Sequence, residues 1–356
     1  MPHFEDGVIP AEYSAYVGRK TFFLIGLAGL SALLIVAAVS LGAVRIPAAD
    51  VLRALLGQSD NARLALIVWN IRLPQALAAI LAGMGLAVAG AAMQSILRNP
   101  LGSPFTLGVS QAGAFGAALA VMVLGSGLMQ SSAAGAVTIL NPWLTTACAF
   151  TFCLLAALVI VAVARLRGTT PEVMVLAGVA LGSLFTAGTM LLQYFADDVQ
   201  LAAMVFWTFG DTARAGWREI GIMAGVVGLA TAFFLANRWN YNAIDAGDET
   251  ARGLGVRVDR VRLTGMLAAC LLTATVVSFL GIIGFVGLVC PHMVRRIIGD
   301  DHRFLLPASC LLGGALLLAA DTVARLALAP HVLPVSVLTA FLGAPTFLYL
   351  LVRGRR

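Results

Sequence analysis

The run Gly284-Phe285-Val286-Gly287-Leu288-Val289-Cys290-Pro291-His292 interrupts a chain of long apolar stretches and is the most informative feature of the sequence. The apolar segment that contains it covers only residues 284–298, whereas a membrane-spanning helix needs about 20 residues. Glycine and proline break helical hydrogen bonding, and broken backbone at membrane depth is tolerated only beside protein or a water-filled cavity. The run therefore predicts a bent helix beside a transport path.

The composition of the whole chain is that of an integral membrane protein. Of its 356 residues 60% are hydrophobic and 11% are charged, whereas a soluble domain has about 25% charged residues. Apolar stretches and their boundaries predict ten spans near residues 21–43, 74–97, 106–125, 142–164, 172–196, 217–237, 260–281, 284–298, 304–328 and 335–352. We predict an all-α integral membrane protein with ten transmembrane helices in a single domain, residues 1–356.

The basic residues indicate how the chain is oriented. With residues 1–20 as a cytoplasmic tail, sixteen of the 23 Lys and Arg residues fall on the cytoplasmic side, six fall on the other side, and Arg325 ends a span. This excess places both termini in the cytoplasm. The arginines form no continuous basic face, so the net charge of +6 does not indicate nucleic-acid binding.

An internal repeat predicts a transporter. The pattern in 72–81, Arg-Leu followed by Leu-Ala-Ala and Leu, recurs in 262–271, and five predicted spans separate the copies. The copies therefore lie on opposite sides of the membrane, as in an inverted five-helix repeat, a common transporter plan. Chance similarity between Ala/Leu-rich helices is the alternative. The same offset relates 98–104 to the run around Pro291.

Three connecting segments are long enough to be structured. Residues 46–57 predict a short amphipathic helix on the membrane surface, and residues 197–217 predict a cap over the outer mouth. The inner loop, 238–259, is polar and predicts a helix that ends at glycine. We interpret this loop as a docking surface, with a plain solvated connection as the alternative.

Catalytic and nucleotide-binding motifs are missing from the sequence. Its four histidines are scattered, and its single lysine, Lys20, does not stand in a P-loop. Outside the loops the notable acid is Asp321, four residues before Arg325, for which an ion pair is the simpler interpretation and a proton relay the alternative. The five cysteines predict buried apolar positions. If transport is ATP-driven, its energy must come from a separate subunit.

With these features in place, the chain closely resembles permeases of the FecCD family, which serve ABC importers for iron-siderophore complexes, haem and cobalamin. The resemblance runs from about Phe22 to the C-terminus. The matching motifs are Arg72-Leu73-Pro74, Gln94 with Arg98-Asn99-Pro100-Leu101, Leu107-Gly108-Val109-Ser110, Leu176-Ala177-Gly178, Gly284–Val289 with Pro291-His292, Asp301-His302-Arg303 with Leu306-Pro307, Asp321 with Ala324-Arg325, and Gly343-Ala344-Pro345.

The resemblance implies the type II ABC importer permease fold and a set of partners. Such a subunit pairs with a second copy of itself around a central path, binds two ABC ATPase subunits, and receives cargo from a periplasmic or surface substrate-binding protein. It resides in the cytoplasmic (inner) membrane of bacteria or archaea. The resemblance implies no cofactor or metal in this chain, with ATP and Mg on the partner ATPase.

The resemblance also implies roles for particular residues. The residues implied to couple to the ATPase are Gly247, Asp248, Ala251, Arg252, Leu254 and Gly255. Asn99 and Leu101 align with the cytoplasmic gate. Arg72 and Arg325 align with arginines that dock the binding protein, and Gln75 stands where the family often has another arginine.

The substrate is the least determined part of the prediction. Candidates for lining the path are Met190, Gln193 and Tyr194, with ordinary helix packing as the alternative. We expect a ferric siderophore first, haem second and cobalamin third. An ion-coupled secondary transporter would need acids or a cation site at mid-membrane, and a membrane-embedded enzyme would need reactive groups placed near one another.

Overall fold

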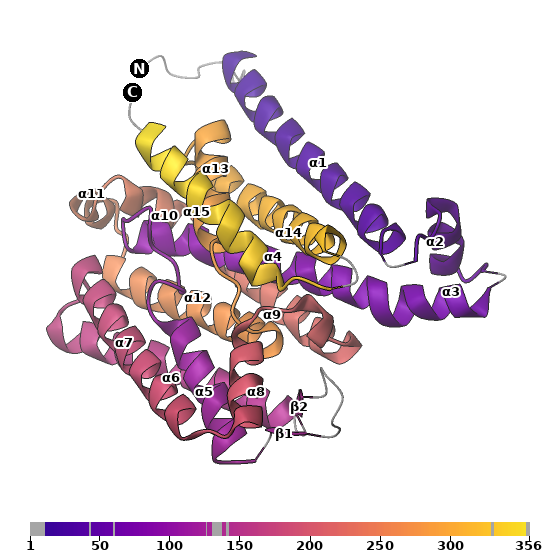
Figure 1. Ribbon diagram of the computed structural model, residues 1–356. Coiled ribbons are helices and arrows are strands. Elements are labelled where there is room, and N and C mark those ends of the chain that lie inside the picture. Colours follow the sequence, from indigo (N-terminus) through magenta and orange to yellow (C-terminus); the bar gives the residue numbers. More distant parts are fainter. Residues whose placement is uncertain are drawn as a thin grey trace.

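The chain folds almost entirely into helices (Figure 1). The computed structural model describes residues 11–42, 44–59, 61–125, 127–129, 137–139, 142–328 and 331–353. The α-helices are α1 Ala11–Ser40, α2 Ala48–Leu55, α3 Ala62–Ile67, α4 Leu73–Ile96, α5 Val109–Met122, α6 Pro142–Arg167, α7 Pro171–Phe195, α8 Asp198–Thr208, α9 Trp217–Ala236, α10 Arg238–Asp245, α11 Asp248–Gly253, α12 Val258–Leu280, α13 Val286–Ile298, α14 His302–Ala327 and α15 Val335–Arg353. A π-helical turn, Val68–Arg72, joins α3 to α4, and Thr212–Arg214 forms a 3₁₀ turn.

Each of the ten predicted spans contains a helix. Within the described residues, seven helices are long and apolar enough to cross a membrane: α1, the continuous Ala62–Ile96, α6, α7, α9, α12 and α14. Two shorter apolar helices are Val109–Met122 and Val335–Thr346. Helix α13 has only 13 residues. The structure thus supports an integral membrane protein of many helices.

Some elements differ from the sequence prediction. Strands β1, Gly127–Met129, and β2, Val137–Ile139, pair antiparallel and were not predicted, but with three residues each they leave the fold class all-α. Residues 1–10 of the predicted cytoplasmic tail lie outside the described residues, and residues 11–20 continue helix α1. The predicted amphipathic helix in 46–57 is present as α2. The predicted outer cap contains α8 and the 3₁₀ turn.

Helix α4 runs through the middle of the molecule (Figure 1) and packs against α9, α12, α13 and α14. Small residues make this packing close. A Cβ atom at Gly83 would lie 2.1 Å from the carbonyl oxygen of Gly313, and one at Gly90 would lie 1.8 Å from that of Gly287. Such backbone contacts are how helices associate in lipid, where packing rather than the hydrophobic effect holds them together.

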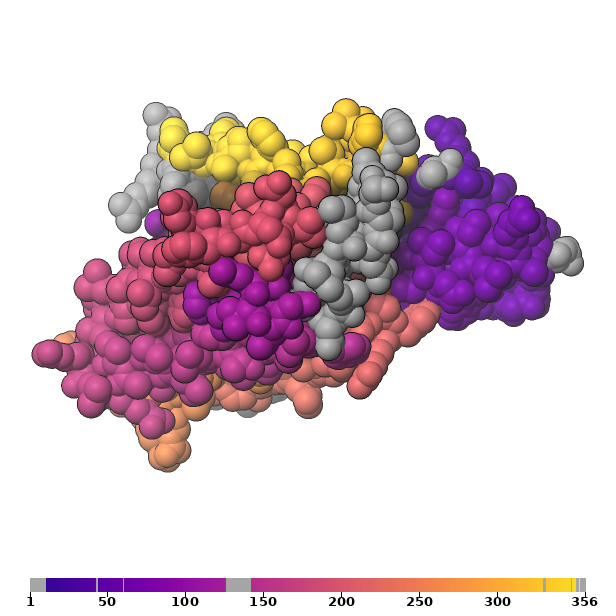
Figure 2. Space-filling view, turned by 60° about the horizontal axis from the view of Figure 1, so that its bottom comes forward, coloured from indigo at the N-terminus to yellow at the C-terminus, as the bar shows by residue number. Residues whose placement is uncertain are grey.

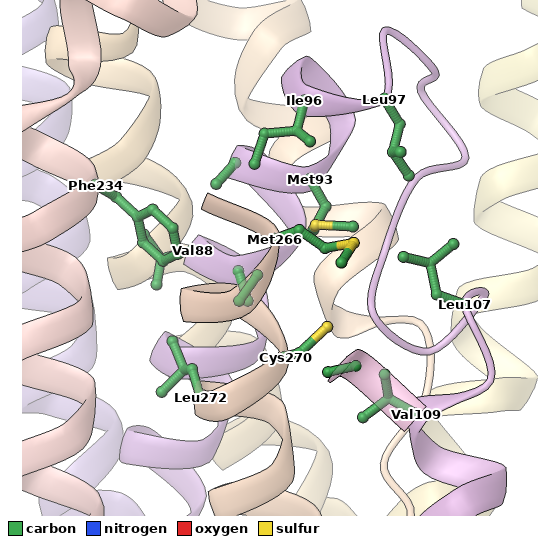
Figure 3. Packing of buried hydrophobic residues seen from close by; sticks show 14 of the residues in the cluster. Val88, Met93, Ile96, Leu97, Leu107, Val109, Phe234, Met266, Cys270 and Leu272 are labelled. Atoms are coloured by element: carbon green, nitrogen blue, oxygen red, sulfur yellow. The ribbon is translucent and has the colours of Figure 1, made fainter. Parts of the chain in front are cut away.

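The core around the C-terminal half of α4 is filled by large apolar side chains. In Figure 3, Met93 and Ile96 of α4 lie beside Met266 and Cys270 of α12. Leu107, from the segment before α5, lies next to Met266. All five are fully buried. Methionine fills irregular gaps well, so this part of α4 is fixed firmly against α12.

The N-terminal helices form one end of the molecule. In the space-filling view (Figure 2) their indigo surface lies opposite the magenta surface from the middle of the chain. Helix α1 packs mainly on α14 and leaves large apolar side chains exposed, among them Phe22, Ile25 and Leu33. Exposed side chains of this kind suit contact with lipid.

Candidate functional site: the inner end of α4 and the coupling segment

The predicted gate residues lie in a tight turn that ends α4. Arg98 has φ of 44°, and its N–H donates to Ser95 O while the N–H of Asn99 donates to Gln94 O. This is a Schellman cap built on a non-glycine residue. The side chain of Asn99 accepts a hydrogen bond from the N–H of Leu101 at 2.9 Å. Asn99 thus holds the turn, and Leu101 is exposed.

The predicted coupling loop is a pair of short helices, α10 and α11, which we call the coupling segment, residues 238–256. Gly247, with φ of 117°, precedes α11, and Gly255, with φ of 84°, ends it. The N–H of Gly255 donates to Arg252 O and that of Val256 to Ala251 O, which is a second Schellman cap. The glycine-ended helix predicted here is therefore confirmed.

The residues predicted to couple to an ATPase divide between two faces of α11 and its C-cap. Leu254 is 70% exposed, and the exposed side chain of Arg252 lies 3.8 Å from that of Asp259. Ala251 is fully buried. Asp248 points inward and takes no part in the outer face. The outward residues are free to meet another protein, whereas the inward ones bind this chain.

Arg262 receives the inward carboxylate of Asp248, and sequence reasoning missed this role. Arg262 is 1% exposed, and its guanidinium donates to both Asp248 oxygens, at 2.7 and 2.8 Å. It also donates to the carbonyl oxygens of Ile96, at 3.1 Å, and Thr169, at 3.3 Å. A bidentate arginine and carboxylate is the strongest common form of ion pair. One side chain thus joins α11 to the end of α4.

A second inward carboxylate, Asp245 at the end of α10, was also missed. Its Oδ2 lies 3.1 Å from Ser95 Oγ, 3.8 Å from Arg295 Nη1 and 3.7 Å from His302 Nδ1. Burial raises the pKa of Asp245, and Arg295 and Ser95 oppose this shift. No local sequence pattern reveals these contacts, because Ser95 lies 150 residues from Asp245, and Arg262 lies 14 residues from Asp248 on another helix.

The two predicted docking arginines are engaged within the chain. Arg72 is 6% exposed and donates to the carbonyl oxygens of Val39, Ser40 and Val44, where α1 ends. Such bonds satisfy carbonyls that a helix end leaves unpaired. Docking through Arg72 stays a prediction, and its burial in this structure does not favour it.

Arg325 forms the predicted ion pair with Asp321, with Nε 3.1 Å from Oδ2. Gln75 Nε2 donates to the other oxygen of Asp321 at 3.2 Å, and the hydroxyl of Thr212 donates to it as well. We call these four residues the outer cluster. Oδ1 of Asp321 accepts both hydrogen bonds, and Oδ2 faces the guanidinium of Arg325 as an ion pair. The cluster also gives Gln75 a partner in the place where the family often has an arginine.

The residues predicted to line the path lie on α7, and two of the three are on its exposed face. Met190 is 62% exposed and Tyr194 is 81% exposed, whereas Gln193 is half-buried. Met190 borders a groove of about 440 Å³ whose polar lining residues are Thr106, Gln111, Ser183 and Thr186. Met190 and Tyr194 are thus available to a neighbour and are not packed inside the subunit.

The run that opens α13 leaves helical geometry only before the helix starts; Pro291 lies inside the continuous helix α13, so the bend expected there stays a prediction. Gly281 and Phe285 have positive φ, 82° and 65°, and α13 begins at Val286. A cavity of about 160 Å³ lies between this segment and residues 103–106, which follow the predicted gate residues. Phe285 also packs on α15, because a Cβ at Gly343 would lie 2.5 Å from Phe285 Cβ. The two interrupted segments therefore lie across one small cavity.

Comparison with known proteins identifies relatives of this chain. A protein described as an ABC transporter permease of Methanocaldococcus jannaschii is 54% identical over 97% of this chain and 98% of its own length. The hemin transport system permease protein HmuU of Yersinia pestis is 37% identical over 85% of this chain and 88% of its own. A cobalamin import permease of Halobacterium salinarum is 39% identical over 80% of this chain and 73% of its own, and an Fe(3+)-citrate import permease of Bacillus subtilis is 34% identical over 94% and 95%.

A solved structure agrees with these relatives. A transporter of metal-chelate ABC type, in an inward-facing conformation, superposes with a TM-score of 0.80 and 28% identity over 93% of this chain and 98% of its own. This chain is accordingly an integral membrane permease component, and its relatives are permease subunits rather than ATPases. Its relatives imply an ATPase and a substrate-binding partner. The FecCD transport family model matches residues 30–353, and the chain belongs to that family.

Proposed function

We propose that this chain is the permease subunit of an ATP-driven importer for a ferric siderophore or related metal chelate. The observation that carries the proposal is the outward face of α11 and its C-cap, where Arg252 and Leu254 are exposed. On the inward face Asp248 is bound by Arg262 of α12, which also donates to the end of α4. A helix with one free face beside the predicted gate is suited to receive motion from an ATPase.

The choice of a metal chelate rests on the relatives. One is named for Fe(3+)-citrate import, and the solved transporter with the same fold is of metal-chelate type. Relatives are also named for hemin and for cobalamin, so importers of haem or cobalamin are the alternatives. The exposed groove beside Met190, with its polar lining, is compatible with each of these bulky cargoes.

The proposed assembly has two copies of this chain, two ABC ATPase subunits and a substrate-binding protein. Cargo passes along the interface between the copies, beside the exposed face of α7. We place the assembly in the cytoplasmic (inner) membrane, with both termini in the cytoplasm and ATP and Mg on the ATPases. In Figure 1 the start of α1, the end of α15 and α11 lie toward one side, which supports this orientation.

Ten crossings and an inverted five-helix repeat belong to the same proposal. Packing supports them, because α5 contacts α6 and α7 just as α13 contacts α14 and α15. Likewise α4 contacts α13 and α12 contacts α5. An ion-coupled transporter would need an available acid in the membrane, whereas the carboxylate of Asp321 is already engaged by Arg325.

The proposal is tested by uptake into proteoliposomes that hold the permease, its ATPase and its binding protein. We expect ATP-dependent uptake of a ferric siderophore, and we expect Arg252→Glu or Leu254→Glu to abolish uptake while the permease still inserts. The matched control is Arg53→Glu, since Arg53 is exposed on α2, far along the chain from α11. Uptake at the wild-type rate in both α11 variants would contradict the coupling role, and uptake that follows only a proton gradient would contradict the proposed function.

A further inference from the structure

The coupling segment is bound to the last turn of α4 at two points. Asp245, at the end of α10, lies 3.1 Å from the hydroxyl of Ser95. Asp248, at the start of α11, is held by Arg262, which also donates to the carbonyl oxygen of Ile96 at 3.1 Å. The two acids are three residues apart, and they reach consecutive residues of α4.

These attachments are buried and shared with other helices. Ser95 and Arg262 are each 1% exposed, and Ser95 also contacts Arg295 of α13, at 3.2 Å, and His302 of α14, at 2.8 Å. Charge-assisted bonds in such surroundings are strong, and removing one partner leaves a buried charge unpaired. By contrast the Arg252 and Asp259 pair is exposed and weak.

The predicted gate begins directly after these attachments. The Schellman cap of α4 joins Gln94 and Ser95 to Arg98 and Asn99, and Asn99 fixes the position of Leu101. Arg98 adds a longer contact of 3.8 Å to Asp248 itself. No flexible linker therefore separates the attachment points from the gate turn.

We propose that Asp245 and Asp248 are positioning residues that transmit movement of the coupling segment to Asn99 and Leu101. When the partner ATPase displaces α10 and α11, Asp245 pulls Ser95 with it, and Asp248 pulls Ile96 through Arg262. The end of α4 then moves with the segment, and the gate turn moves with it. This inference rests on the proposed function, because it takes the ATPase as the source of the displacement.

The experiment uses the assembled transporter with Asp245→Asn, Asp248→Asn and the matched control Asp300→Asn. Asp300 also binds Arg295, at 3.0 Å, but its side chain is exposed and the structure gives it no contact with α4. We expect cargo taken up per ATP hydrolysed to fall about tenfold in the first two variants, within the range of about 5- to 150-fold that is typical of coupling between sites. We expect the Asp300→Asn variant to match the wild type.

Hydrogen exchange separates lost coupling from general loosening. In the wild type, ATP should change amide protection both in residues 248–255 and in residues 97–107. In the Asp245 and Asp248 variants the change in 248–255 should persist and that in 97–107 should disappear, and Asp248→Glu should restore part of it. Ser95→Ala, a smaller change at the same attachment, serves where an acid variant fails to assemble.

Wild-type exchange changes and wild-type uptake per ATP in the assembled variants would overturn the inference. A wild-type complex that takes up cargo without ATP is a different result, because it overturns the proposed function instead.

Discussion

At position 90 the packing of α4 leaves no room for a methyl group, because a Cβ there would lie 1.8 Å from the carbonyl oxygen of Gly287. Gly90 is thus required by the distance between two helices and not by its own backbone conformation. By contrast, a methyl group at Gly221 or Gly225 on α9 would meet nothing within 4 Å. Glycines of the two kinds should respond to substitution in opposite directions.

We expect Gly90→Ala to force α4 and α13 apart and to lower the free energy of unfolding by about 1–3 kcal/mol or more, the usual cost of overpacking. Gly225→Ala should be neutral or should stabilise the protein by up to about 1 kcal/mol, because alanine is the better helix former. Thermal unfolding of both purified variants in detergent measures the difference. Equal stability of the two variants would contradict this account of α4.

At the scale of elements, the coupling segment depends on how α11 ends. Gly255 has φ of 84° and its N–H donates to Arg252 O within the cap, whereas Gly253 is the last residue of the helix and has no positive φ. A side chain at a left-handed position costs about 1–2 kcal/mol, and here it would disturb the orientation of Leu254. The end of this short helix therefore sets the shape of its outward face.

We expect Gly255→Ala to weaken binding of the ATPase subunit by about tenfold, since about 1.4 kcal/mol corresponds to that factor. Gly253→Ala is the control, because a methyl group there meets nothing within 4 Å. Titration of the ATPase against the permease in nanodiscs gives both affinities. If the two variants bind alike, the cap does not shape the docking face.

Many of the helices and their ends could be predicted from the sequence. Hydropathy predicts the helices because each span must satisfy its own backbone, and glycine predicts the end of α11. The strand pair and the division into α10 and α11 could not be predicted, since short polar or mixed segments carry no clear period. The contacts that Asp245, Asp248 and Arg262 make could not be predicted either, because they join different helices and no short-range pattern connects the partners.

At the scale of the whole molecule, the outer cluster joins parts of the chain that lie far apart. Asp321 and Arg325 stand on α14, Gln75 on α4 and Thr212 on the 3₁₀ turn, and Arg325 also donates to Ala38 O of α1 at 3.3 Å. The sequence predicted the ion pair, because its two residues are four apart on one helix. It did not predict that this partly exposed arginine would join a cluster around the buried carboxylate of Asp321.

We expect Arg325→Ala to lower the free energy of unfolding by about 3–5 kcal/mol, because Asp321 would be left buried and unpaired. The double variant Arg325→Ala, Asp321→Asn should recover much of that loss. Chemical denaturation of the wild type and both variants measures the effect. An Arg325→Ala variant of wild-type stability that binds the substrate-binding protein poorly would favour the docking role instead.

The two faces of α11 also bear on protein engineering. An attempt to make this permease accept the ATPase of another transporter would commonly exchange the whole inner loop. Such a graft would replace Asp245 and Asp248, and so would strip Ser95 and Arg262 of their buried partners. Exchanging only outward positions such as Arg252 and Leu254 would change the recognition surface and leave the scaffold intact, which makes α11 a natural unit for designing chimeric importers.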